Sequence, residues 1–147
     1  MKKLIRFIKN LFNPVEHRRE YTRSDDRFQR FLLIEEELQE AINDKIYLQP
    51  GFGMSQLSVQ VGIPYHHLTA YFNLYLGITF NDWKNNLRIE YILEQFDQGR
   101  NRKLTLETLA REAGYLSRSN FINSFKKKLG INPSQYVNLL IYQKNVN

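Results

Sequence analysis

Residues 105–136 of this chain read TLETLAREAGYLSRSNFINSFKKKLGINPSQY, and this stretch decides the fold. Apolar residues recur at helical spacing on both sides of Gly114, and a second glycine, Gly130, follows the second run. A short helix, a glycine turn and a longer helix form the outline of a helix-turn-helix. The second helix of such a unit can enter the major groove of DNA.

The same outline occurs a second time, earlier in the chain. Gly62 and Gly114 lie 52 residues apart, and Gly77 and Gly130 lie 53 residues apart. The matching apolar residues are Met54, Leu57, Val61, Leu68, Phe72 and Leu76 in the first copy, and Leu106, Leu109, Ala113, Phe121, Phe125 and Leu129 in the second. Two such units predict a protein that reads two neighbouring stretches of duplex.

The composition bounds the protein class. A chain of 147 residues makes one domain, or two small ones that share a connecting element. Hydrophobic residues at 42% and aromatic residues at 14% supply a core and argue against global disorder. The absence of cysteine removes disulfides, thiolate zinc sites and cysteine nucleophiles, and it fits a cytoplasmic protein. No apolar run approaches the roughly 18 residues that span a membrane.

The net charge of +6 is concentrated at the two ends of the chain. From Arg100 onward there are nine basic residues against two acidic ones, Glu107 and Glu112. A basic block inside a folded module indicates a polyanionic partner. The alternative is a solvated cationic face, but the repeat beside it favours nucleic acid.

Residues 1–43 form a separate N-terminal region in this interpretation. Residues 1–12 are either a basic amphipathic helix that lies on a membrane surface or a partner, or a terminal helix that covers part of the core. A linker follows, and then an amphipathic helix over 28–43, with Asp25 or Asp26 as its N-cap. Four glutamates on its outer face should avoid DNA, so we expect this helix behind the reading helices.

Residues 44–147 form the second region, with a first helix-turn-helix at 54–76, a connecting helix at 80–98 and a second helix-turn-helix at 105–129. The predicted fold is all-α, with two helix-turn-helix subdomains joined by a long connecting helix and preceded by an extra N-terminal helical segment. At 1.5 Å per residue the connecting helix is about 30 Å long, close to the ~34 Å between successive turns of a major groove.

The sequence also predicts details at the helix ends. Gly62 occupies a turn that needs a positive φ, and Pro64 fits the first position of the next helix. Asn132 caps a final helix that starts at Pro133. Four apolar residues of that helix are expected to seal the second unit: Tyr136, Val137, Leu140 and Ile141.

These residues resemble the DNA-binding module of the AraC-type (AraC/XylS) transcription regulators over roughly residues 44–140. The motif residues of the second unit are Leu109-Ala110, Gly114-Tyr115, Ser117, Ser119, Phe121, Phe125-Lys126-Lys127, Gly130, Pro133 and Tyr136. Those of the first unit and connecting helix are Leu57, Gly62-Ile63-Pro64, His67-Leu68-Thr69, Phe72-Asn73, Gly77, Phe80, Trp83, Leu87-Arg88-Ile89 and Ile92-Leu93. The first unit departs from the family at Ser58, where alanine is usual.

The resemblance implies sequence-specific binding to double-stranded DNA by two recognition helices in successive major grooves. It places base contacts on the outward face near the start of each recognition helix. The base-reading candidates are His66, Thr69, Ala70, Arg118, Ser119, Asn120, Ile122 and Asn123. The phosphate candidates are Tyr65, Asn73, Arg100, Arg102, Lys103, Lys126 and Lys127.

The resemblance also implies RNA polymerase as a second partner and an upstream sensor, for which residues 1–43 offer a docking segment. The chain has no room for a sensor domain, so we expect either a small stand-alone regulator or a fragment of a longer one. No small-molecule site is evident, and no cofactor or metal is expected, because the adjacent His66 and His67 point in different directions on a helix.

Two other function classes compete with DNA binding. An enzyme is disfavoured, because no Ser–His–Asp arrangement or glycine-rich phosphate loop is visible. A helical interaction module or membrane-tethered adaptor would use the basic N-terminus, but it leaves the two-unit repeat unexplained.

Overall fold

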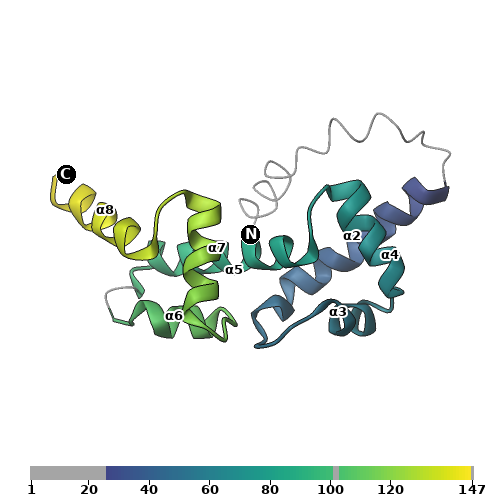
Figure 1. Ribbon diagram of the computed structural model, residues 1–147, viewed down its shortest axis with the longest axis horizontal. Coiled ribbons are helices and arrows are strands. Elements are labelled where there is room, and N and C mark those ends of the chain that lie inside the picture. Colours follow the sequence, from purple (N-terminus) through teal and green to yellow (C-terminus); the bar gives the residue numbers. More distant parts are fainter. Residues whose placement is uncertain (1–25, 101–102, 147) are drawn as a thin grey trace. The chain divides into compact units, whose positions relative to one another are not determined.

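The computed structural model describes residues 26–100 and 103–146, and every regular element within these ranges is a helix (Figure 1). The all-α prediction is therefore confirmed. The elements are α2 (Asp26–Asn43), the 3-10 helix η2 (Ile46–Leu48), α3 (Met54–Val61), α4 (Tyr65–Ala70), the π-helix η3 (Tyr71–Leu76), α5 (Phe80–Asp97), α6 (Leu106–Glu112), α7 (Arg118–Leu129) and α8 (Pro133–Val146).

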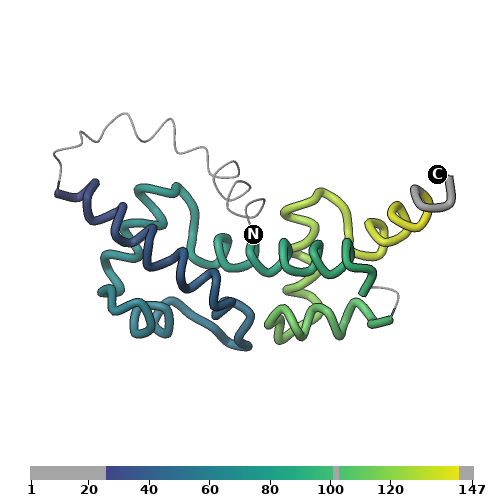
Figure 2. Tube along the Cα trace, turned by 180° about the vertical axis from the view of Figure 1, so that it is seen from behind, coloured from purple at the N-terminus to yellow at the C-terminus, as the bar shows by residue number. Residues whose placement is uncertain are grey.

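The described residues divide into two compact units. The first contains residues 26–47 and 52–84, and the second contains residues 48–51, 85–100 and 103–146. Helix α5 is continuous from Phe80 to Asp97 and contributes residues to both units (Figure 2). The predicted N-terminal segment 1–12 and its linker lie outside the described residues, as do Asp25 and Arg102.

In the first unit, α2 packs against α3 and η3. Phe31, Ile34 and Leu38 are buried, at the three- and four-residue spacing that the sequence predicted. Glu36 and Glu40 are exposed. The helix starts at Asp26, two residues before the expected start at Phe28, and of its other two glutamates Glu37 is exposed and Glu35 is half-buried.

The turn between α3 and α4 is held by local hydrogen bonds. Gly62 has a φ of 66°, which confirms the predicted left-handed residue. The Ser58 hydroxyl, at the position where the sequence departs from the AraC-type pattern that it resembles, donates to the Ile63 carbonyl at 2.6 Å. Ser58 therefore stabilises the turn in a way that alanine cannot. Pro64 lies just before α4, as its N-cap, one position earlier than predicted.

The second helix of the first unit differs from the prediction. One α-helix was expected to run to Leu76, but the α-helix ends at Ala70 and continues as a π-helix. The wider turn buries both Tyr71 and Tyr75, whose ring centroids lie 5.8 Å and 5.1 Å from that of Phe31 on α2. Leu76, predicted to be buried, is only half-buried. Packing against another helix decides this geometry, so periodicity alone does not reveal it.

The core of the second unit comes from α5, α6, α7 and the turn before α7. Its fully or nearly fully buried residues are Ile89, Ile92, Phe96, Leu109, Ala110, Ala113, Tyr115, Phe121 and Phe125. Tyr136 of α8 packs its ring against Phe96 and Phe125, at centroid distances of 5.8 Å and 5.6 Å. Leu109, Ala113, Phe121 and Phe125 belong to the predicted apolar pattern, whereas Ile89, Ile92, Ala110 and Tyr115 were singled out through the family motif.

Gly114 has a left-handed backbone conformation and also lies too close to its neighbours to carry a side chain. Its φ is 85°, and a Cβ there would lie 2.7 Å from the guanidinium of Arg88 and still closer to the carbonyl oxygen of Leu48. Arg88 is buried, donates to the carbonyl of Gln49 at 2.9 Å and lies over the Tyr115 ring at 5.4 Å. Burial lowers the pKa of Arg88, and Tyr115 partly offsets this effect.

Helix α8 begins as predicted but packs differently at its far end. The Gln135 N–H donates to Asn132 Oδ1 at 2.9 Å, and the Asn132 N–H donates to Gln135 Oε1 at 3.0 Å. The prediction that Ile141 seals the second unit is wrong, because its exposed fraction is 52%. Ile141 lies about 100° around the helix from Leu140, away from the packed face.

Candidate nucleic-acid interface

Helix α7 presents a polar surface at its first two turns. Ser117 is the N-cap, and its hydroxyl oxygen accepts a hydrogen bond from the Asn120 N–H at 3.2 Å. Because Phe121 and Phe125 are buried, the opposite face of the helix is directed to solvent. The side chains predicted to read bases from this helix are exposed at Arg118, Ser119, Asn120 and Asn123, and half-buried at Ile122.

One acidic residue lies beside this surface. Glu107 is in the first turn of α6, and its carboxylate is 3.5 Å from the guanidinium of Arg118. Both side chains are substantially exposed, so the pair contributes little stability. Sequence inspection singled out Arg118 but missed Glu107, because the two residues are eleven positions apart and meet only across the turn.

The three consecutive lysines at the end of α7 have different surroundings. Lys126 and Lys127 are exposed, as their proposed role at the phosphate backbone requires. The Lys128 side chain is only 5% exposed, and its Nζ lies 2.9 Å from Glu90 Oε1 on α5. Burial lowers the pKa of Lys128 in spite of the attraction of Glu90. Lys128 therefore joins α7 to α5.

The basic loop before α6 is partly used by the protein itself. Arg100 forms an ion pair with Glu112 at 3.0 Å and donates to Gln95 Oε1 at 2.7 Å. The hydrogen bond to Glu112 raises the pKa of Arg100. A phosphate would have to compete with these partners, whereas Lys103 in the same loop is exposed.

Helix α4 offers a neutral surface in the first unit. Tyr65 and His66 are exposed, and Asn73 is exposed on η3. Thr69 and Ala70 are half-buried, and the Thr69 hydroxyl donates to the Tyr65 carbonyl at 3.0 Å. Residues 52–81 contain no Lys, Arg, Asp or Glu, so α4 and η3 carry no Lys, Arg, Asp or Glu side chain of their own.

His67 connects α4 to α2 rather than joining the outward surface. One of its ring nitrogens, Nε2, lies 3.2 Å from the guanidinium of Arg30, and its ring centroid lies 4.2 Å from that of His66. Partial desolvation, together with His66 and Arg30, lowers the pKa of His67. The neutral imidazole can then accept a hydrogen bond from Arg30.

Residues 26–100 and 103–146 contain no group of three His, Asp or Glu side chains that could hold a metal ion. Among the helices that the structure describes, none has the length and apolar character needed to cross a bilayer.

The family model described as a helix-turn-helix domain matches residues 57–138, which run from α3 into α8. The chain belongs to the AraC-type family. This family consists of DNA-binding transcription regulators rather than enzymes, in agreement with the interpretation of the sequence.

Two AraC-type relatives come from Yersinia. The virulence regulon transcriptional activator VirF of Yersinia enterocolitica is 31% identical over 101 residues, which cover 69% of this chain and 35% of that protein. The thermoregulatory protein LcrF of Yersinia pestis matches with the same identity and coverage. The chain therefore matches about a third of the length of these relatives.

One solved structure has a similar fold. A protein of unknown function from Listeria innocua superimposes with a TM-score of 0.61 at 24% sequence identity. The superposition covers 72% of this chain and 96% of that one. This likeness concerns the fold alone.

Proposed function

We propose that this protein is a sequence-specific transcription regulator that places α4 and α7 in successive major grooves of double-stranded DNA. The observation that carries the proposal is the start of α7, where a capped N-terminus presents Arg118, Ser119 and Asn120 to solvent. Arginine can pair with guanine O6 and N7, and asparagine can pair with adenine. Family membership and the name of the VirF relative support a role in transcription.

The two units divide the work in this proposal. The second unit supplies phosphate attraction through Lys126, Lys127 and Lys103, and base contacts through α7. The first unit, whose recognition surface is uncharged, contributes base contacts from His66 and adjacent residues and little phosphate attraction. One chain then binds an asymmetric site, because the two surfaces differ.

The test is selection of bound duplexes from a random pool, followed by mobility shift with the selected duplex and a scrambled one. Arg118→Ala should weaken binding to the selected duplex by about 1–3 kcal/mol and relax the preference at one or two positions. Lys126→Ala is the matched control, because it removes a positive charge from the same helix and should weaken both duplexes equally. Selection that returns no enriched sequence would overturn the proposal.

A further inference from the structure

The second unit contains a cavity of about 480 Å³ beside the start of α7. It is lined by α6, by the turn between α6 and α7, by the first turns of α7 and by the first residues of α8. Its volume is within the range of small-molecule sites in proteins. The apolar part of the lining comes from Leu106, Ala110, Leu116, Phe121, Ile122 and Pro133.

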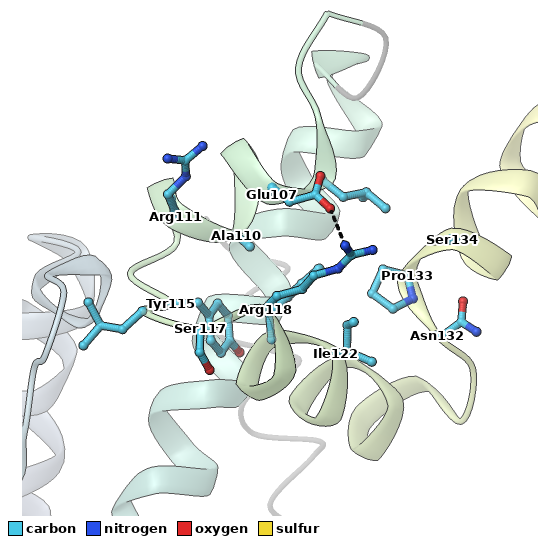
Figure 3. Close-up of a pocket in the computed structure, with 13 residues that line it drawn as sticks. Glu107, Ala110, Arg111, Tyr115, Ser117, Arg118, Ile122, Asn132, Pro133 and Ser134 are labelled. Atoms are coloured by element: carbon cyan, nitrogen blue, oxygen red, sulfur yellow. Dashed lines mark ion pairs between the residues drawn. The ribbon is translucent and has the colours of Figure 1, made fainter.

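A single ion pair borders this apolar cavity. Figure 3 shows the Arg118 side chain extending toward Glu107, with Pro133 and Ile122 nearby. The guanidinium–carboxylate distance is 3.5 Å, and the Arg118 side chain is 71% exposed. Figure 3 also shows that Arg111, the other arginine of the lining, is directed away from this pair.

The charge around the cavity favours an anion over a cation. Arg118 carries five N–H donors in a planar fork that matches a carboxylate. The N-terminal ends of α7 and α8, where the N-cap Ser117 and the first-turn residue Ser134 line the cavity, carry the positive ends of two helix dipoles. The charged residues of the lining are two arginines, Arg111 and Arg118, against one carboxylate, Glu107, so the net charge of the lining is positive.

We propose that this cavity binds a small amphiphilic carboxylate, with the hydrocarbon tail among the apolar residues and the carboxylate on Arg118. Binding replaces Glu107 as the partner of Arg118. This exchange costs little, because an exposed ion pair of this kind is worth at most about 1 kcal/mol. The tail meanwhile removes apolar surface of Leu116, which is 77% exposed, from water.

A consequence for DNA follows, and it rests on the proposed function. A carboxylate on Arg118 occupies the donors that would otherwise face a guanine. The ligand should therefore lower the affinity for the selected duplex more than it lowers the affinity for random DNA.

The experiment is an NMR titration of the ¹⁵N-labelled full chain with octanoate, in the absence of DNA. Octanoate should shift amide resonances of the cavity residues, such as Ala110, Leu116 and Ile122, and leave those of α2 unchanged. 1-Octanol and octylammonium have the same tail with no charge and with the opposite charge. Both should bind at least about tenfold more weakly, because they lack the charge-assisted hydrogen bonds to Arg118.

Three variants separate this site from general attraction of anions. Arg118→Gln should weaken octanoate binding about tenfold, and Glu107→Gln should strengthen it by removing the competing carboxylate. Lys126→Gln, which removes the same charge from the same helix outside the cavity, should leave the affinity for octanoate unchanged.

Absence of cavity shifts with octanoate, equal binding of octanol, or tighter binding of octylammonium would each overturn the proposal. Equal loss of affinity in Arg118→Gln and Lys126→Gln would also overturn it. A mobility shift of the selected duplex with and without octanoate then tests the consequence for DNA. Because the titration needs no DNA, a failure of the proposed function would not be mistaken for a failure of the site.

Discussion

Replacement of Lys128 with methionine tests whether the junction between α7 and α5 depends on a buried ion pair. The Lys128 side chain is 5% exposed and that of Glu90 is 16% exposed, with 2.9 Å between Nζ and Oε1. Burial lowers the pKa of Lys128 even though Glu90 opposes that shift. The loss of hydration therefore outweighs the attraction within the pair, and the two charges together should add little net stability.

The expected magnitudes follow from this geometry. Lys128→Met leaves the Glu90 carboxylate without its cation in a largely dry position, which costs about 3–5 kcal/mol for a fully buried charge. Because Glu90 retains some exposure, we expect a value near the lower end, about 3 kcal/mol, or more than a hundredfold in the folding equilibrium. The double variant Lys128→Met/Glu90→Leu removes both charges and should be within about 1 kcal/mol of the wild type, or more stable.

The assay is urea unfolding followed at two positions. Hydrogen exchange of the α7 amides reports the second unit, while fluorescence of Trp83, the single tryptophan, reports the first. Lys128→Met should reduce protection in α7 and leave the Trp83 transition in place. The reasoning is refuted if the single variant loses less than about 1 kcal/mol, or if the double variant is destabilised as much as the single one.

Four other predictions concern DNA binding and stability. Replacing Lys126 and Lys127 with alanine should flatten the dependence of log K on log salt by up to roughly one unit for each phosphate that is no longer neutralised, and an unchanged slope in mobility shifts would contradict this. Inserting four alanines in α5 after Lys84 rotates the following residues by about 400° and moves them about 6 Å along the helix axis. Circular dichroism should still report helix. Full-strength binding to the selected duplex would exclude a fixed spacing between α4 and α7. The pKa of His67 is lower in the folded state than in the unfolded state, so the unfolded state binds a proton there at a higher pH. The stability of the first unit should therefore fall as the pH drops below about 6.5. His67→Gln should flatten this pH profile in unfolding monitored by Trp83 fluorescence. Gly114→Ala should destabilise the second unit by about 2 kcal/mol or more in thermal melts, because it combines a left-handed φ with a backbone clash; a wild-type melting temperature would count against that account.

The sequence by itself determined the helices and most of their ends. Caps at Ser117, Thr105 and Asn132, and the left-handed turn at Gly62, involve residues within a few positions of one another. The buried stripes of α2, α6 and α7 follow the 3.6-residue period. Such signals are local, so they can be read before any tertiary contact is known, and the repeat of these signals at offsets of 52 and 53 residues was enough to indicate two helix-turn-helix units.

Only the tertiary structure decided how chemically similar residues differ in their surroundings. Lys126 and Lys128 are two positions apart, yet one is exposed and the other is buried against Glu90. The π-helix arises from the packing of Tyr71 and Tyr75 against α2, and the cavity beside Arg118 arises where three helices meet. These features depend on side chains that are distant in sequence, and neither propensity nor periodicity specifies which distant side chain will be the neighbour.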